Sequence, residues 1–174
     1  MNNLIAQAAA TPPEESIRLI PLSQDKFAIV DAADYDWLNQ WKWSLHSYAG
    51  KEYAGRIERI GTDRHTLKMH RLITSAPTGI EVDHRDGNGL NNTRSNLRLA
   101  THQQNSCNMK RHRDNNSGFK GVYWNTGKKR WDAKICVRGK HYLLGRFIKK
   151  EDAVKAYEEG APRLHGEFAR VNRG

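Results

Sequence analysis

The chain has 174 residues, of which 37% are hydrophobic and 28% are charged, which suits one medium domain or two small ones. Its formal net charge is +10, but residues 1–60 carry a net charge of −2 and residues 61–174 a net charge of +12. No stretch approaches the roughly 20 apolar residues that a membrane span needs. Cys107 and Cys136 form no CxxC pair, which argues against a zinc knuckle or a disulfide framework and favours a reducing cytoplasm.

The first 60 or so residues predict a small β-rich segment. Residues 1–16 lack periodicity and the basic start of a signal peptide, so they are expected to form a flexible tail. Asp31 is placed to cap a short helix over residues 32–39. Strands are expected at about 17–22, 27–30, 42–48, 52–60 and 65–68, and a short helix at 69–74.

Residues 79–112 predict a hairpin followed by a helix. Val82-Asp83-His84 ends a strand, and the Asp-, Gly- and Asn-rich residues 85–92 form an irregular connection. Leu97 and Leu99 alternate on the returning strand. Thr101 and Gln104 have the spacing of a capping box, which puts Asn105 in the first turn of the next helix. This frame can bring Asp83, His84 and Asn105 into one groove.

Those three side chains supply what phosphodiester hydrolysis needs. Histidine titrates near neutral pH and can accept the proton of an attacking water. A carboxylate and an amide oxygen can hold Mg²⁺, which takes only one or two protein ligands and leaves its other positions to water and phosphate. A bound cation offsets the charge on the phosphate and the leaving group.

This segment resembles the HNH endonuclease family, in particular its phage and mobile-intron homing members. The resemblance rests on Val82-Asp83-His84, on Asn96-Leu97-Arg98-Leu99-Ala100-Thr101 and on Gln104-Asn105. It implies that His84 is the general base, that Asp83 and Asn105 are metal ligands, and that Asn96 braces the hairpin loop. The last motif position is Asn instead of His, a known variant. Upstream, Met69-His70-Arg71-Leu72 resembles the family's lead-in, with Arg71 a candidate phosphate contact.

The C-terminal third is strongly basic and predicts a second unit. Residues 110–150 hold 13 basic and only 2 acidic side chains, which suggests a polyanion partner, although a solubilising surface is the alternative. The turn formers at 114–118 predict a linker. Strands are expected at 119–124, 130–138 and 141–147, followed by a helix at about 151–165 in which Pro162 predicts a distorted or early end.

Residues 117–172 resemble an AP2 domain, on Ser117-Gly118-Phe119-Lys120-Gly121-Val122-Tyr123-Trp124, Arg130-Trp131-Asp132-Ala133-Lys134-Ile135, Leu144-Gly145-Arg146-Phe147 and the segment 165–172. The resemblance implies a three-stranded sheet laid in the major groove of duplex DNA and backed by one helix. Trp124 and Trp131 either support this sheet or touch DNA. The candidate DNA-binding residues are Lys120, Tyr123, Trp124, Arg130, Trp131, Lys134, Arg138 and Arg146.

The sequence therefore predicts an α+β chain: a β-rich segment with a ββα-metal nuclease unit over residues 17–113, and an AP2-like domain over residues 117–172. The expected function is homing-type cleavage of double-stranded DNA with Mg²⁺ or another divalent cation such as Mn²⁺, without structural zinc. No membrane and no obligate protein partner is expected, and the expected location is the cytoplasm of a bacterial or phage-infected cell. The alternatives are a non-catalytic DNA-binding regulator and an RNA-directed or non-specific defence nuclease.

Overall fold

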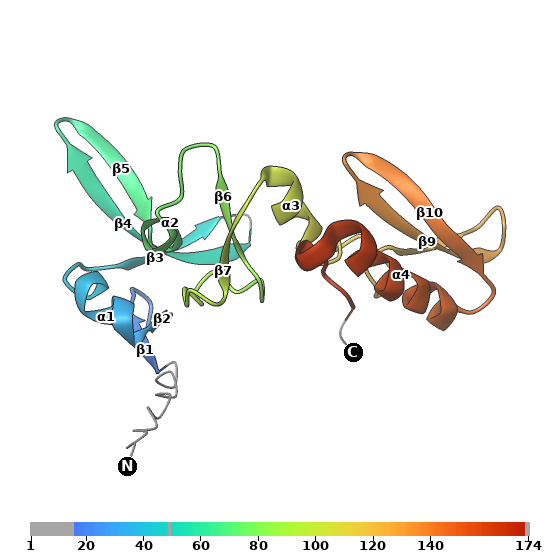
Figure 1. Ribbon diagram of the computed structural model, residues 1–174, viewed down its shortest axis with the longest axis horizontal. Helices are drawn as coiled ribbons and strands as arrows, with labels where there is room; N and C mark the ends of the chain where they lie inside the picture. The colour runs from blue at the N-terminus through green and yellow to red at the C-terminus, as the bar shows by residue number, and fades with distance from the viewer. Residues whose placement is uncertain (1–15, 49, 173–174) are drawn as a thin grey trace, which may run out of the picture.

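A computed structural model of the chain describes residues 16–48 and 50–172, so the predicted flexible tail lies, apart from Ser16, outside the described residues. Within these ranges the fold is a mixed α+β arrangement of two two-stranded and two three-stranded antiparallel sheets. Figure 1 shows the N-terminal sheets on one side, the C-terminal sheet with its long helix on the other, and helix α3 between them. In the described part of the chain, no helix has the length and apolar character needed to cross a membrane.

The N-terminal segment forms the larger hydrophobic core. Strands β1 (Ile17–Pro21) and β2 (Phe27–Asp31) form a hairpin, followed by helix α1 (Ala32–Leu38). Strands β3 (Ser44–Tyr48), β4 (Lys51–Ile60) and β5 (Asp63–Lys68) form the next sheet, and helix α2 (Met69–Thr74) follows directly. The fully buried side chains of this core include Ile20, Val30, Leu38, Trp43 and Met69.

The hairpin and helix expected at residues 79–112 are present. Strand β6 (Glu81–His84) pairs with β7 (Leu97–Ala100) in a register that sets Asp83 opposite Arg98. Helix α3 (His102–Cys107) begins at the predicted capping box, in which the Thr101 side chain and the Gln104 side chain each bond to the other residue's backbone N–H.

The loop between β6 and β7 is fixed by the N-terminal hairpin. The backbone of Ile29 donates to Leu90 O at 2.8 Å and accepts from Asn92 N at 2.7 Å, which adds the loop to β2 as a short parallel bridge. Asp31 differs from its predicted role: its side chain does not cap α1 and instead accepts a hydrogen bond from Arg94 N at 2.7 Å. Asp31 bonds to Arg94 because the loop between β6 and β7, which is held against β2, brings the backbone N–H group of Arg94 next to the carboxylate.

The C-terminal unit is a three-stranded antiparallel sheet packed on one helix. Its strands β8 (Val122–Asn125), β9 (Arg130–Val137) and β10 (Lys140–Phe147) lie in the order β10-β9-β8. Strand β8 begins three residues later than predicted. Helix α4 (Lys150–His165) continues through Pro162, so the expected early end does not occur, and a 3-10 turn η1 (Gly166–Phe168) follows. Ala153, Tyr157 and Ala161 pack on Val122, Ala133 and Ile135 to form a second core.

We expect Arg94→Ala to destabilise the fold. Arg94 donates from Nε and Nη2 to the two carboxylate oxygens of Asp34 at 2.8 and 2.7 Å, and only 3% of Asp34 is exposed. Removing the cation leaves a buried carboxylate without its main partner, at a cost on the order of 2–3 kcal/mol. Chemical denaturation at pH 7 measures this loss, and Arg64→Ala on the exposed edge of β5 serves as the control.

The stability difference between wild type and Arg94→Ala should disappear in acid. Burial would raise the pKa of Asp34, but the hydrogen bonds from Arg94 and Trp37 outweigh burial and hold the pKa below its usual value. A lowered folded-state pKa contributes stability that is present above the unfolded-state pKa and disappears as pH falls through the folded-state pKa. The stability difference between wild type and Arg94→Ala should therefore narrow as pH falls below the unfolded-state pKa of about 4, and close as pH falls through the lower folded-state pKa. A gap that stays constant down to pH 2 would contradict this origin.

Candidate active site

Three of the predicted site residues line one open cavity of about 650 Å³: Asp83, His84 and Asn105. The end of β6 supplies the first two, and the first turn of α3 supplies Asn105. The other walls come from the start of β4, the loop after β6 and the basic segment that follows α3. Their lining residues include Lys51, Tyr53, Asn88, Asn108, Lys110, Arg111 and Arg113, and Arg170 of the C-terminal segment also lines the cavity.

His84 is buried, and its ring orientation is set by Asn92. The amide nitrogen of Asn92 donates to Leu90 O at 3.0 Å, so its Oδ1 faces His84 Nε2 at 3.5 Å. An acceptor at Nε2 places the proton on that nitrogen and leaves the Nδ1 lone pair free. Burial lowers the pKa of His84, against an opposing effect of Asn92, so the ring is neutral at pH 7. A neutral, oriented imidazole is ready to accept a proton.

A second buried histidine packs beside it. The rings of His70 and His84 meet edge to face with centroids 5.1 Å apart, and Tyr53 lies 5.5 Å from His70 and 6.0 Å from His84. His70 Nδ1 is buried without a hydrogen-bond partner among the described residues. Burial, with a smaller contribution from His84, lowers the pKa of His70 to about 3. His70 is therefore a neutral packing neighbour of His84 at physiological pH.

Asp83 is held by a buried ion pair. Arg98 donates to Asp83 Oδ2 from Nε at 2.8 Å and from Nη2 at 2.6 Å. The amide nitrogen of Asn108 donates to both carboxylate oxygens, at 3.0 and 3.1 Å, and to His84 O at 2.8 Å. Arg98 therefore uses the Oδ2 side, whereas Oδ1 accepts only from Asn108 among the described residues and keeps acceptor capacity for a cation.

Asn105 presents its oxygen in a similar way. Its amide nitrogen donates to Glu81 Oε2, which commits the NH₂ group and leaves Oδ1 as the free end. The cavity thus offers a carboxylate oxygen and an amide oxygen, the hard ligands that suit Mg²⁺ or Mn²⁺. No group of three or more His, Cys, Asp or Glu side chains among the described residues is arranged to hold a metal. A two-ligand oxygen site is the kind of metal centre these residues fit.

Asn96 and Arg71 do not line this cavity, and each is engaged in fixing a loop. Asn96 bonds to Asp86 through both amide atoms, at 3.0 and 3.1 Å, and to Asn91 O at 2.8 Å. Arg71 donates to three carbonyl oxygens, those of Ala76, Pro77 and Ile80, at 2.7–2.9 Å. The geometry gives Arg71 a task in holding the α2–β6 connection and gives no support to the predicted phosphate contact.

Comparison with known proteins places the segment that contains these residues in a family. Residues 68–107, which span α2 to α3, match the HNH endonuclease family. The chain is 33% identical over 161 residues to an uncharacterized HNH endonuclease of Acanthamoeba polyphaga mimivirus, covering 89% of this chain and 79% of the relative. The chain belongs to the HNH endonuclease family. It is also 38% identical over 107 residues to Protein 3.8 of Escherichia phage T7, covering 62% of this chain and 88% of that protein. No solved structure matches the chain significantly.

Membership in the HNH endonuclease family makes the chain a DNA-cleaving nuclease, which decides against the non-catalytic regulator. HNH nucleases generally use a divalent metal ion. The 40 matched residues carry Asp83, His84, Asn96 and Asn105, whereas the C-terminal unit lies outside the match.

The C-terminal sheet of this HNH protein has one face covered by α4 and one open face. Asp132 lies on the open face with 1% exposure, between Lys134 Nζ at 3.1 Å and Arg146 Nε at 3.2 Å. Tyr123, paired with Asp132 across the strands, is 45% exposed on the same face. The buried carboxylate holds two cations in place on the open face, and Arg130 extends the positive charge along β9.

The remaining predicted DNA contacts lie elsewhere. Lys120 donates from Nζ to Cys107 O and Met109 O at 2.6 and 2.7 Å, and burial lowers its pKa to about 8. Its ammonium ties the unit to the end of α3, so it does not belong to the open face. Trp131 packs in the second core and meets the half-exposed Trp124 at 5.1 Å. Arg138 is exposed in the β9–β10 turn.

Three residues of the site escaped the sequence reasoning: Asn92, Arg98 and Asn108. Arg98 occupies a strand position whose register partner is Asp83, and that register was the one available signal. Asn92 and Asn108 lie in irregular segments, where no periodicity tells which way an amide points.

Proposed function

We propose that the chain is a homing-type DNA endonuclease that uses a divalent metal ion and selects its site through the C-terminal sheet. The observation that carries the proposal is the common cavity of Asp83, His84 and Asn105 at the meeting point of β6 and α3. A base, a carboxylate and an amide oxygen then face the same space, as phosphodiester hydrolysis requires.

In this mechanism His84 Nδ1 takes a proton from the water that attacks phosphorus, and Asn92 keeps the imidazole in the tautomer that can do so. Asp83 and Asn105 would hold Mg²⁺ or Mn²⁺, which supplies charge stabilisation at the phosphate and the leaving oxygen. Arg98 and Asn108 orient the carboxylate. Asn96 braces the loop between β6 and β7 through Asp86, and so supports the position of Asn92.

An AP2-like role of the C-terminal unit is supported by its architecture and charge. A three-stranded antiparallel sheet with a helix on one face leaves the other face free for a DNA groove. Lys134, Arg146 and Arg130 provide cations there, and Tyr123 an aromatic ring. The partner is duplex DNA. Free Cys107 and Cys136, together with a phage relative, support a place in the cytoplasm of an infected cell.

The decisive experiment is a cleavage assay on the full chain. Purified protein with Mg²⁺ should cut duplex DNA, and EDTA should stop the reaction. Single-stranded DNA and RNA of the same sequence, assayed in parallel, test the defence-nuclease alternative. Sequencing the ends cut from a randomised duplex library tests site selection, and random ends would contradict the homing-type proposal. Undiminished cutting in EDTA would contradict the metal-ion mechanism.

We expect Arg130→Ala to weaken duplex binding by roughly 1 kcal/mol and to lower the slope of log affinity against log salt by about 1, because one phosphate contact is lost. Fluorescence anisotropy in EDTA, across 50–300 mM salt, measures both quantities without cleavage. Lys155→Ala is the matched control, since Lys155 is exposed on α4 away from the sheet. Equal effects of the two substitutions would show that only net charge matters.

A further inference from the structure

Building on the proposed nuclease function, we propose that Arg170 of the C-terminal unit is a phosphate-binding residue of the cavity that Asp83, His84 and Asn105 line. The C-terminal unit then completes the cleavage site in addition to binding DNA. The ligand chemistry is a phosphodiester of duplex DNA next to the bond that is cut.

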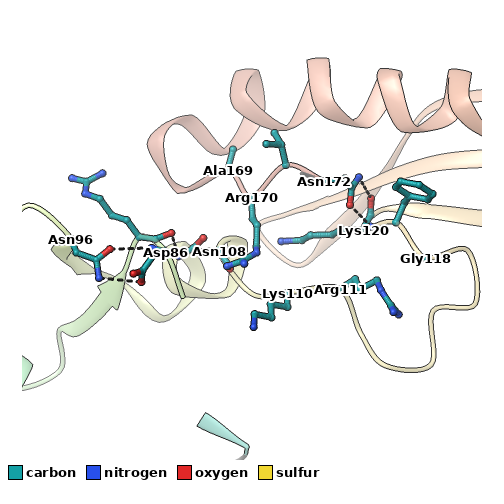
Figure 2. A pocket seen from close by; sticks show the side chains of 13 residues that line it. Asp86, Asn96, Asn108, Lys110, Arg111, Gly118, Lys120, Ala169, Arg170 and Asn172 are labelled. Carbon is teal, nitrogen blue, oxygen red and sulfur yellow. Dashed lines mark hydrogen bonds between the residues drawn. The ribbon is translucent and has the colours of Figure 1, made fainter. Parts of the chain in front are cut away.

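Arg170 belongs to the segment after η1 but lies against the nuclease unit. It lines the cavity that holds Asp83 and His84, and it also lines the adjoining cavity of about 570 Å³ next to the linker. Its Nη1 is 3.4 Å from Asn108 O, and Asn108 is the residue whose side chain holds Asp83. Figure 2 shows the side chain extending from the C-terminal segment to Asn108.

The loop that follows His84 leaves room for this guanidinium. Gly87 has φ +75°, and a Cβ added there would stand 2.6 Å from Arg170 Nη1. A side chain at this position would therefore displace the guanidinium. The absence of a Cβ at Gly87 lets the arginine approach the loop between β6 and β7 closely, within the same cavity as the proposed base.

Two anchors fix the segment on either side of Arg170. Phe168 is buried, with its ring centroid 3.9 Å from Arg98 Cζ, and the neighbouring carbonyl of Glu167 accepts from Arg98 Nη1. On the other side, Asn172 accepts from Lys120 N at 2.6 Å and donates to Lys120 O at 3.3 Å. The first anchor is the same Arg98 that holds Asp83, so the C-terminal segment docks directly behind the proposed metal ligand.

The guanidinium has donors to spare. Within residues 16–48 and 50–172, Arg85 and Arg98 both pair with Glu167, whereas Arg170 forms no ion pair and contacts one carbonyl at the long limit of a hydrogen bond. Lys51, Lys110 and Arg113 line the same cavity and add to its positive potential. A planar guanidinium with free N–H groups in a cationic cleft is suited to bidentate contact with a phosphate.

The test uses the full chain with Arg170→Ala and Arg170→Lys, and Arg163→Ala as the control, because Arg163 is an exposed arginine of α4. We expect Arg170→Ala to lower kcat/KM roughly 10–100-fold, the worth of a charge-assisted hydrogen bond to phosphate. Arg170→Lys should recover part of the loss, since it keeps the charge but not the fork. In EDTA, the salt slope of duplex binding should fall by about 1 for Arg170→Ala.

The outcomes separate this inference from the function on which it rests. A wild-type protein that fails to cut any nucleic acid would overturn both. If the wild type cuts and Arg170→Ala cuts as fast, with an unchanged salt slope, the inference alone fails. A loss that tracks a lower melting temperature, with no recovery in Arg170→Lys, would make Arg170 a structural contact and would also overturn the proposal.

Discussion

Replacing Asp83 should abolish DNA cleavage. Asp83→Ala removes the one anionic ligand of the proposed metal site and leaves mainly the neutral oxygen of Asn105. Because a bound cation contributes several kcal/mol to stabilising charge in the transition state, a loss on the order of 10³-fold or more is expected. The Mg²⁺ concentration that gives half-maximal rate should rise in parallel in the milder variant Asp83→Asn. A titration of rate against Mg²⁺ measures both effects.

The control for Asp83 follows from its ion pair. Asp83 and Arg98 have side-chain exposures of 5% and 7%, so deleting one partner also costs roughly 3–5 kcal/mol of stability. Arg98→Met breaks the same pair but keeps the carboxylate, and the double variant Asp83→Ala/Arg98→Met removes both charges. If inactivity came from instability alone, the double variant would regain activity. Restored cutting in that variant would remove Asp83 from the metal site.

The local patterns of the sequence predicted the frame of the site well. The capping box of Thr101 and Gln104 is a contact between residues three apart, and it places the start of α3 and therefore Asn105. The strand expected around Leu97 and Leu99 is present as β7, but its burial does not alternate, because Leu97, Arg98 and Ala100 are buried whereas Leu99 is 48% exposed. The capping-box signal lies within a few residues of the structure that it specifies.

Contacts between distant segments were beyond such patterns. Asp31 is of a residue type that often caps helices and precedes α1, yet its carboxylate accepts a hydrogen bond from the backbone N–H of Arg94, which only the folded loop brings near. Lys120 is of a residue type that often contacts DNA phosphates, yet its ammonium group donates hydrogen bonds to two backbone carbonyls at the end of α3. The tautomer of His84 depends on Asn92, whose own orientation depends on Leu90. These hydrogen-bond partners are set by which segments lie close together in the folded chain, so no periodic pattern in the sequence indicates them.

Replacing His84 should slow the chemistry without removing the ligands. His84→Ala is expected to lower the cleavage rate roughly 10²–10⁴-fold, the usual worth of a positioned general base. Mg²⁺ activation and duplex affinity should stay close to wild type, because the proposed metal ligands and the C-terminal sheet are unchanged. Single-turnover cleavage and anisotropy in EDTA measure the two properties separately.

The direction in which the cleavage rate changes with pH tests whether His84 acts as a base. The neutral imidazole is the active form, so the rate should rise with pH through the histidine's pKa and then become flat. Burial lowers that pKa, so the inflection should lie below the ordinary value of about 6.5, and the variant should lack it. A rate that falls with rising pH in this range would mean that a protonated histidine acts instead.

His70 provides the matched control for packing. It is as buried as His84, at 5% exposure, and belongs to the same aromatic cluster, but its pKa of about 3 keeps it neutral and it does not line the cavity. His70→Ala should therefore lower the melting temperature about as much as His84→Ala, while the cleavage rate falls far less. If the two variants lose activity equally and in step with stability, the histidine pair holds the hairpin together and the base is another group. Loss of activity confined to His84→Ala, with the pH inflection gone, is the result that a general base requires.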